Sequence, residues 1–180
     1  MKNANKKYKN GEVILEYTDK WDYWGSHPKG VVIEKGDEIL LNGKELLYKG
    51  EWDYWWPHPK GIVIRKGDEI LLNGKELLYK GKWDYWQPHP KGIVIEKGDE
   101  LLLNGKELLY KGEWDNWHAH PKGIVIRKED EFLLNGKKLL HKGKWNSWRA
   151  HPKGVVIHNG DELLLNGKEV LYKGKWDDWQ

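Results

Sequence analysis

The chain has no cysteine and no strong excess of charge of either sign. Without cysteine it has neither disulfides nor thiolate metal ligands, so the sequence does not indicate a redox compartment. Its 31 Lys and Arg residues nearly balance its 28 Asp and Glu residues, and the two signs are interspersed. This balance argues against a nucleic-acid partner and against binding to a charged membrane surface. The apolar runs are all short, so no transmembrane segment is expected.

Signatures of secretion and of catalysis are also missing. Residues 1–9 have no apolar stretch of the kind that a signal peptide needs. The localisation is therefore unknown, with the cytoplasm favoured. No G-x-S-x-G, P-loop, H-E-x-x-H or dinucleotide fingerprint occurs. We accordingly expect no enzyme activity, no cofactor, no metal site and a monomeric chain.

Tryptophan is abundant, and its spacing is regular. Twelve of the 13 Trp residues form six Trp-x-x-Trp pairs, and the first Trp of each pair stands 31 residues after the previous one. His-Pro-Lys-Gly and Asn-Gly recur with nearly the same interval. A period of this length indicates one supersecondary unit stacked on copies of itself. We therefore predict a single repeat domain over residues 1–180, with five full units starting near residues 21, 52, 83, 114 and 145.

One repeat predicts short antiparallel strands. In the second unit, residues 61–65 and 69–72 are short apolar runs, and Asn73-Gly74 then predicts a two-residue type I′ turn. Residues 75–80 follow as a third strand, and residues 52–56 are a candidate for a short fourth. No run between Gly or Pro is long enough for a helix.

The apolar runs are continuous rather than alternating, as in Ile62-Val63-Ile64. Successive side chains of a strand point to opposite faces, so both faces of each sheet must be covered. Neighbouring repeats can provide this cover in a β-propeller or in an open stack of sheets. A β-helix is disfavoured because Asn-Gly hairpins join antiparallel strands.

The two ends of the chain carry complementary parts of one repeat. Residues 9–15 match the Asn-Gly hairpin of the other units, and residues 176–180 match the start of a unit. We expect the hairpin around Asn10-Gly11 and the tail Trp176–Trp179 to share one blade. The predicted fold is an all-β, six-bladed β-propeller of 31-residue repeats. Segments 1–20 and 176–180 together would form most of its sixth blade.

Residues 55–64, Trp-Trp-Pro-His-Pro-Lys-Gly-Ile-Val-Ile, and their copies resemble a known family pattern. They are similar to the W-x-P-D-G-x-x-I stretch that joins the first two strands of a blade in TolB-type and WD40-like β-propellers. Here Lys stands where those families often place Asp. The repeat is also shorter than the usual length of about 40 residues, which leaves three or four strands per blade open. The resemblance implies the fold and no ligand.

The Trp-Asp elements allow two interpretations. Exposed Trp faces beside Asp could stack on sugar rings, whereas buried Trp residues would pack one blade on the next. Both Trp positions are the same in all six copies while their neighbours vary, which favours packing and predicts solvent-facing variable positions. If there is a ligand, the candidate contact residues are Asp53, Trp55, Trp56, Asp84, Trp86, Gln87, Asp115, Trp117 and His118.

Three functional hypotheses follow. A protein-interaction scaffold predicts that the variable residues Trp56, Gln87, His118 and Arg149 share one rim. A multivalent, lectin-like binder of glycans or small ligands requires partly exposed Trp-Asp elements. A repeat-amplified or engineered propeller would have no evolved ligand. The partner, protein or glycan, is unknown.

Other repeated polar residues have simpler interpretations. The five histidines of His-Pro-Lys-Gly are expected to be turn residues bonded to nearby backbone rather than metal ligands. The Asp of the Trp pairs changes only to Asn146, which points to a turn hydrogen bond. The residue after each Ile-rich strand alternates, as Glu34, Arg65, Glu96 and Arg127. This alternation predicts opposite charges on adjacent blades, or it reflects duplication of a two-repeat block.

Overall fold

A computed structural model of the chain describes residues 5–9, 12–17 and 21–174. All regular secondary structure in these residues is β-strand, and they contain no helix. The chain divides into two compact units, residues 1–82 and residues 83–180. A membrane-spanning helix is absent from the described residues.

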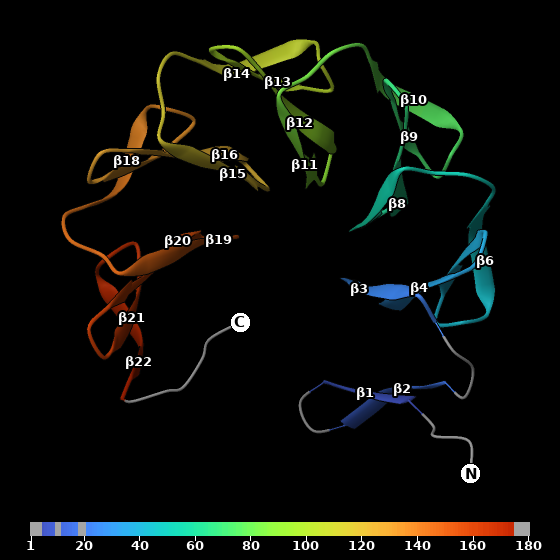
Figure 1. Cartoon of the computed structure of the whole chain (residues 1–180). Helices are drawn as coiled ribbons and strands as arrows, with labels where there is room; N and C mark the ends of the chain where they lie inside the picture. Colours follow the sequence, from blue (N-terminus) through green and yellow to red (C-terminus); the bar gives the residue numbers. More distant parts are fainter. Residues whose placement is uncertain (1–4, 10–11, 18–20, 175–180) are drawn as a thin grey trace. The chain divides into compact units, whose positions relative to one another are not determined.

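The first unit contains a hairpin and two four-stranded antiparallel sheets (Figure 1). Strands β1 and β2 form the hairpin, and each sheet follows chain order from its first strand to its fourth. The bounds are β1 Asn5–Lys9, β2 Glu12–Tyr17, β3 Tyr23–His27, β4 Gly30–Lys35, β5 Glu38–Leu41, β6 Glu45–Lys49, β7 Tyr54–His58, β8 Gly61–Lys66, β9 Glu69–Leu72 and β10 Glu76–Lys80.

The second unit contains three more sheets of the same kind, each also in chain order. The strands are β11 Tyr85–His89, β12 Gly92–Lys97, β13 Glu100–Leu103, β14 Glu107–Lys111, β15 Asn116–His120, β16 Gly123–Lys128, β17 Glu131–Leu134, β18 Lys138–Lys142, β19 Ser147–His151, β20 Gly154–Asn159, β21 Glu162–Leu165 and β22 Glu169–Lys173.

The prediction of an all-β chain of repeated antiparallel sheets is confirmed, and the number of strands per repeat is four. The candidate fourth strand is real and is the first of each sheet. In the second repeat it is β7, which begins two residues later than the predicted segment 52–56 and continues to His58.

The core lies between sheets rather than within one. The second strand of each sheet contributes a run of consecutive buried residues, and Ile62, Val63 and Ile64 of β8 are fully buried. In the first unit, Ile62 and Ile64 pack against Val32 and Leu41 of the preceding sheet. The second unit repeats this packing at both of its sheet junctions. Both faces of these sheets are therefore covered, as the continuous apolar runs predicted.

Neighbouring sheets also meet through their first strands. Strand β3 lies beside β7 in the first unit, and β15 lies beside both β11 and β19 in the second. The side chains that follow each Trp pair on these strands are consequently placed at a junction between two sheets.

The Asn-Gly turns agree with the prediction in dihedral angles but not in length. Asn73 and Gly74 have φ of 54° and 66°, and Lys75 N–H closes the turn by donating to Leu72 O at 3.1 Å. However, Leu72 pairs with Glu76, so the loop between the paired residues has three residues. The prediction of a two-residue loop was wrong on this point. Lys75 is the extra residue in the loop.

A β-bulge follows each of these turns. In β10, Leu77 pairs with Leu71 and Tyr79 pairs with Ile70, which leaves Leu78 as the extra residue. Leu77 is 53% exposed, whereas Leu78 is buried. The two leucines thus lie on opposite faces of the edge strand, as successive residues do, and the buried Leu78 is the residue that the register skips.

Candidate functional site

The tryptophans of the Trp-x-x-Trp pairs lie mainly at the sheet junctions. Trp55 and Trp117 are each only 3% exposed and belong to the two clusters that join their sheets to the preceding ones. Among the ten described residues of these pairs, Trp24 is the most open, at 37%. This burial is what packing requires, and it leaves the second Trp of these repeats no accessible ring face for a sugar.

Two of the buried indoles are fixed by a carboxylate of the preceding sheet. Trp55 Nε1–H donates to Glu34 at 2.5 Å in the first unit, and Trp117 Nε1–H donates to Glu96 at the same distance in the second. A tyrosine of the preceding sheet packs edge-on against each indole. The Tyr23–Trp55 ring centroids are 5.5 Å apart, and the interplanar angle is 77°.

Arginine changes the junction where it replaces this glutamate. The guanidinium carbon of Arg127 lies 5.1 Å from the ring centroid of Trp145, the first Trp of the next repeat. The alternating residues at positions 34, 96 and 127 therefore contact aromatic rings of the following sheet. This gives the alternation a structural role that the simple expectation of opposite charges on adjacent blades did not include.

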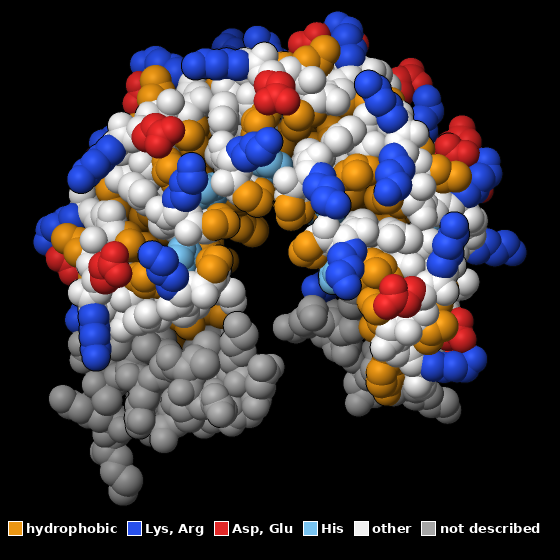
Figure 2. All heavy atoms as spheres, turned by 180° about the vertical axis from the view of Figure 1, so that it is seen from behind, with side chains coloured by type: hydrophobic (Ala, Val, Ile, Leu, Met, Phe, Trp, Pro, Cys, Tyr) orange, Lys and Arg blue, Asp and Glu red, His pale blue; other side chains and the backbone are white. Residues whose placement is uncertain are grey.

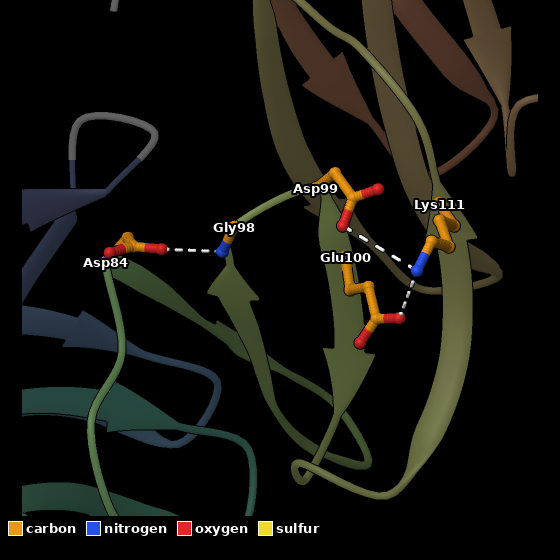
Figure 3. A network of polar contacts seen from close by, with 5 residues as sticks. All are labelled: Asp84, Gly98, Asp99, Glu100 and Lys111. Carbon is orange, nitrogen blue, oxygen red and sulfur yellow. Dashed lines mark hydrogen bonds and ion pairs between the residues drawn. The ribbon is translucent and has the colours of Figure 1, made fainter.

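The Asp of each Trp pair caps the turn between the second and third strands. Asp84 Oδ2 accepts a hydrogen bond from Gly98 N–H at 2.6 Å (Figure 3). Asn146 makes the equivalent bond to Gly160 N–H at 2.8 Å through Oδ1. One acceptor oxygen is all that this position requires, which explains why Asn can replace Asp. The predicted turn hydrogen bond is confirmed.

At the variable position after the second Trp, Trp56 and Arg149 are exposed, as predicted, whereas Gln87 and His118 are half-buried against the next sheet, contrary to the prediction. Gln87 bonds to the backbone of β15, accepting from Ala119 N–H at 2.9 Å and donating to Trp117 O at 3.2 Å. The His118 ring packs edge-on against Trp148, with centroids 4.8 Å apart. These residues vary because each fits a different neighbour. The equivalent Gly25 leaves room for Pro57 of the next sheet.

The position between Asp and the second Trp is exposed, as predicted, in most repeats. Tyr23, Tyr54 and Tyr85 are 52%, 40% and 53% exposed, and Asn116 is also exposed. Ser147 is half-buried. The shared rim of Trp56, Gln87, His118 and Arg149 spans the two units and stays a prediction.

All five histidines of His-Pro-Lys-Gly accept a backbone N–H of their own turn, and all except the half-buried His151 are buried. In the third repeat, His89 Nδ1 accepts from Lys91 N–H at 3.1 Å, which places the proton of the neutral ring on Nε2. His89 Nε2 lies 2.8 Å from His120 O in the next sheet, so the same ring also links two sheets. Burial lowers the pKa of His120. The described residues contain no group of three His, Asp or Glu side chains suited to a metal ion.

Sequence reasoning missed a second role of the Asn-Gly asparagine. Asn73 Oδ1 accepts from Ile62 N–H at 3.0 Å, and Asn73 Nδ2 donates to Lys60 O at 3.1 Å. The side chain thereby ties this turn to the His-Pro-Lys-Gly turn of the same sheet. A Cβ at Gly61 would collide with the Asn73 amide. The co-occurrence of this Asn with His-Pro-Lys-Gly in every full repeat was the signal for that contact.

Charged side chains of both signs are spread over the face seen in Figure 2. Lys111 of β14 lies 2.9 Å from Glu100 and 3.8 Å from Asp99 (Figure 3). The hydrogen bond to Glu100 and the nearby acidic charges raise the pKa of Lys111. Such exposed pairs add little stability, because solvent screens their charges. The acidic residues of the Lys-Gly-Asp-Glu turns are thus solvated, and in each sheet a lysine of the fourth strand pairs with the Glu.

Two open pockets at equivalent junctions bring some of the candidate ligand-binding residues together. A pocket of about 180 Å³ in the first unit is lined by Tyr23, Glu34, Trp52, Asp53, Tyr54 and Trp55. One of about 400 Å³ in the second is lined by Tyr85, Gln87, Glu96, Trp114, Asp115, Asn116, Trp117 and His118. Trp56, Asp84 and Trp86 do not line either pocket.

These pockets combine aromatic rings with carboxylates and with polar side chains that are hydrogen-bonded to the backbone. Their chemistry suits recognition of a ligand by stacking, hydrogen bonding and negative charge. No protein family, curated protein or solved structure matches this chain in the comparisons made.

Proposed function

We propose that the chain is a non-enzymatic scaffold or protein-interaction module built as a six-bladed β-propeller. The observation that carries this proposal is that the repeated polar side chains serve the framework. The repeated Asp caps a turn, the repeated Asn joins two turns, and the repeated His binds its own turn. A surface that differs between repeats is then left for a partner. We propose a monomer without a nucleic-acid or membrane partner.

The N-terminal hairpin supports the sixth blade. Its register skips one residue, because Lys7 pairs with Leu15 and Tyr8 pairs with Val13. The β5–β6 hairpin has the same skip, since Ile39 pairs with Tyr48 and Leu40 with Leu46. Strands β1 and β2 are therefore the equivalent of the third and fourth strands of a full repeat. The segment 176–179 repeats the Trp pair that begins a first strand.

The turn at Asn10-Gly11 and the tail Trp176–Trp179 lie outside the described residues, so their pairing is tested in solution. Because the chain has no cysteine, spin labels can be attached at Lys7→Cys and Asp177→Cys. Four strands spaced about 4.8 Å apart span about 15 Å, so one blade predicts a label separation below roughly 30 Å. A longer, broad distance distribution would contradict closure of the sixth blade.

The interaction surface is testable through its exposed variable residues. Tyr23, Tyr54 and Tyr85 are exposed tyrosines that later repeats replace. A variant with serine at all three positions loses the edge-on contacts to Trp55 and Trp117, and it should remain folded at the assay temperature while losing the partners captured by the full chain. Equal capture by the variant would argue against this surface. The control is Lys75→Ser, in an exposed turn on another part of the sheet.

Glycan or small-ligand binding is the second candidate function, favoured by the pocket at Tyr23, Trp52 and Asp53. A lectin-like site predicts that a glycan array gives defined hits that Tyr23→Ala and Tyr85→Ala abolish. The third candidate is a repeat-amplified or engineered propeller without an evolved ligand. It predicts no specific capture in either experiment.

A further inference from the structure

The pockets beside Glu34 and Glu96 have the same construction in two separate units. Each combines a tyrosine and a glutamate of one sheet with a Trp-Asp-x-Trp segment of the next. In the first pocket these residues are Tyr23, Glu34, Trp52, Asp53 and Trp55, and in the second they are Tyr85, Glu96, Trp114, Asp115 and Trp117.

The third described junction shows what such a pocket accommodates. Arg127 stands in the repeat where Glu34 and Glu96 stand, and Trp145 is the counterpart of Trp52 and Trp114. The guanidinium of Arg127 lies over the Trp145 ring, 5.1 Å from its centroid. At this junction the chain supplies its own organic cation to the first Trp of the pair.

The two junctions with Glu34 and Glu96 carry a negative charge at the position where Arg127 carries a positive one. Glu34 directs one carboxylate oxygen to the Trp55 indole, and Asp53 directs one to Gly67 N–H. Both side chains also line the open pocket beside the half-buried Trp52. Aromatic faces attract cations, and the Glu34 carboxylate adds to the attraction, whereas Asp53 Oδ2 already lies 3.8 Å from Arg65 Nε. A neutral sugar would gain hydrogen bonds but nothing from the negative charge.

We propose that the pockets at Glu34 and Glu96 bind an organic cation of the guanidinium or quaternary-ammonium class. The cation lies against the first Trp of the following repeat, where Arg127 lies in the third junction. Each unit holds one such site among the described residues. The proposal concerns ligand binding within single units, so it goes beyond the scaffold function and does not depend on closure of the sixth blade.

The two pockets differ in volume, and one lining residue accounts for the difference. Tyr54 lines the first, whereas Asn116 occupies the same repeat position in the second. The volumes are about 180 Å³ and about 400 Å³ respectively. A compact head group suits both pockets, and a cation with a longer substituent is expected to prefer the second.

Titration of the full chain with matched small probes tests the proposal. Arginine amide and choline represent the two cation types, 3,3-dimethylbutan-1-ol is the uncharged counterpart of choline, and methyl glucoside represents a sugar. Calorimetry should give two cation sites per chain, with binding that weakens as salt rises. The uncharged alcohol and the glucoside should bind at least about tenfold more weakly.

Substitutions can distinguish loss of the carboxylate charge from loss of the folded structure. Glu34→Gln and Glu96→Gln retain an oxygen that can accept from the Trp indole, and each should weaken its cation site about tenfold. The triple change Asn116→Tyr, Arg127→Glu and Asn146→Asp should instead add a third site. Melting temperature and circular dichroism verify folding. If Glu96→Gln does not fold, Tyr85→Leu at an exposed position removes an aromatic wall of the same pocket.

Four results would overturn the proposal, of which three concern the pattern of binding. They are equal binding of choline and its uncharged counterpart, unchanged cation affinity in the folded glutamine variants, and binding of the glucoside alone. The last of these would support the glycan alternative. Absence of any cation binding would also overturn it, while leaving the scaffold proposal intact.

Discussion

Gln87 and the backbone of Ala119 form a complementary contact between two sheets. The Gln87 amide oxygen accepts from Ala119 N–H at 2.9 Å, while its amide nitrogen donates to Trp117 O at 3.2 Å. It thereby satisfies one edge of β15, whose other edge pairs with β16. In the first unit the equivalent pair is Gly25 and Pro57, where Pro has no N–H to donate.

We predict that Gln87→Ala lowers the free energy of unfolding by about 1–2 kcal/mol, because two half-buried backbone groups lose their partner. Urea unfolding measures this value. The control is Asn116→Ser, at an exposed position where the next repeat already has Ser147, and it should have a smaller effect. Equal effects of the two changes would contradict the structural role of Gln87.

A double-mutant cycle tests the specificity of the same contact. Ala119→Pro should be strongly destabilising beside Gln87, because it removes the donated N–H and adds bulk. The combination of Gln87→Gly with Ala119→Pro reproduces the Gly25–Pro57 pair and should recover about 1 kcal/mol or more of that loss. Additive effects would show that the two positions are not coupled.

Burial of the second Trp predicts a large loss of stability on truncation. Trp117→Ala should cost about 3–5 kcal/mol, because it leaves a cavity beside Ile126 and removes the indole bonded to Glu96. The more exposed Trp24 provides the comparison, and Trp24→Ala should cost clearly less. A melting temperature unchanged by Trp117→Ala would refute the packing interpretation.

The Asp of each Trp pair caps a turn with one acceptor oxygen. We therefore predict that its negative charge is not needed for stability. Asp84→Asn should change stability by less than about 0.5 kcal/mol, because Asn146 already caps Gly160. Asp84→Ala should cost about 1 kcal/mol, because Gly98 N–H loses its acceptor. Thermal unfolding of the two variants decides between a cap and a requirement for charge.

Glu129 has φ of 54°, whereas other repeats have Gly at the same turn position. Left-handed backbone costs a residue with a Cβ roughly 1–2 kcal/mol. Glu129→Gly should therefore raise the free energy of unfolding by about 1 kcal/mol, and Gly98→Ala should lower it by a similar amount. Gly136→Ala should cost more than Gly98→Ala, because its added Cβ would also collide with the Tyr110 ring.

Burial of histidine predicts acid sensitivity. Burial lowers the pKa of His120 and of His118 below the usual value of 6.5. Between the lowered pKa and 6.5, the unfolded chain binds more protons than the folded chain, so stability falls as the pH falls through this range. His120→Asn keeps an acceptor near Lys122 N–H and should flatten the dependence. An equally steep pH profile in that variant would contradict this assignment.

Local features of the fold could be predicted from the sequence because they depend on residues close together in the chain. Asn73-Gly74 encodes its own positive φ angles, and the runs Ile62–Ile64 encode burial on two faces. The Asp-to-Asn146 exchange likewise pointed to the turn bond that is observed. Each inference needed only one repeat, or a comparison of repeats within the chain.

Contacts between repeats could not be inferred in the same way. The variability of Gln87 and His118 suggested exposure, because the partners that define these positions belong to the next sheet. The bulge at Leu78 was missed for a related reason: apolar spacing alone does not show where a strand skips a residue. Variation among repeats thus reflects matched pairs at a junction as well as surface drift.

The alternation of glutamate and arginine has a consequence for how this array can change length. Glu34 and Glu96 engage an indole N–H of the following sheet, whereas Arg127 covers an indole face. Deleting a single repeat would place two junctions of one type in succession, whereas deleting two adjacent repeats would preserve the order. From Glu34 to Arg127, the smallest change in length that keeps this alternation is therefore 62 residues, twice the visible period of 31.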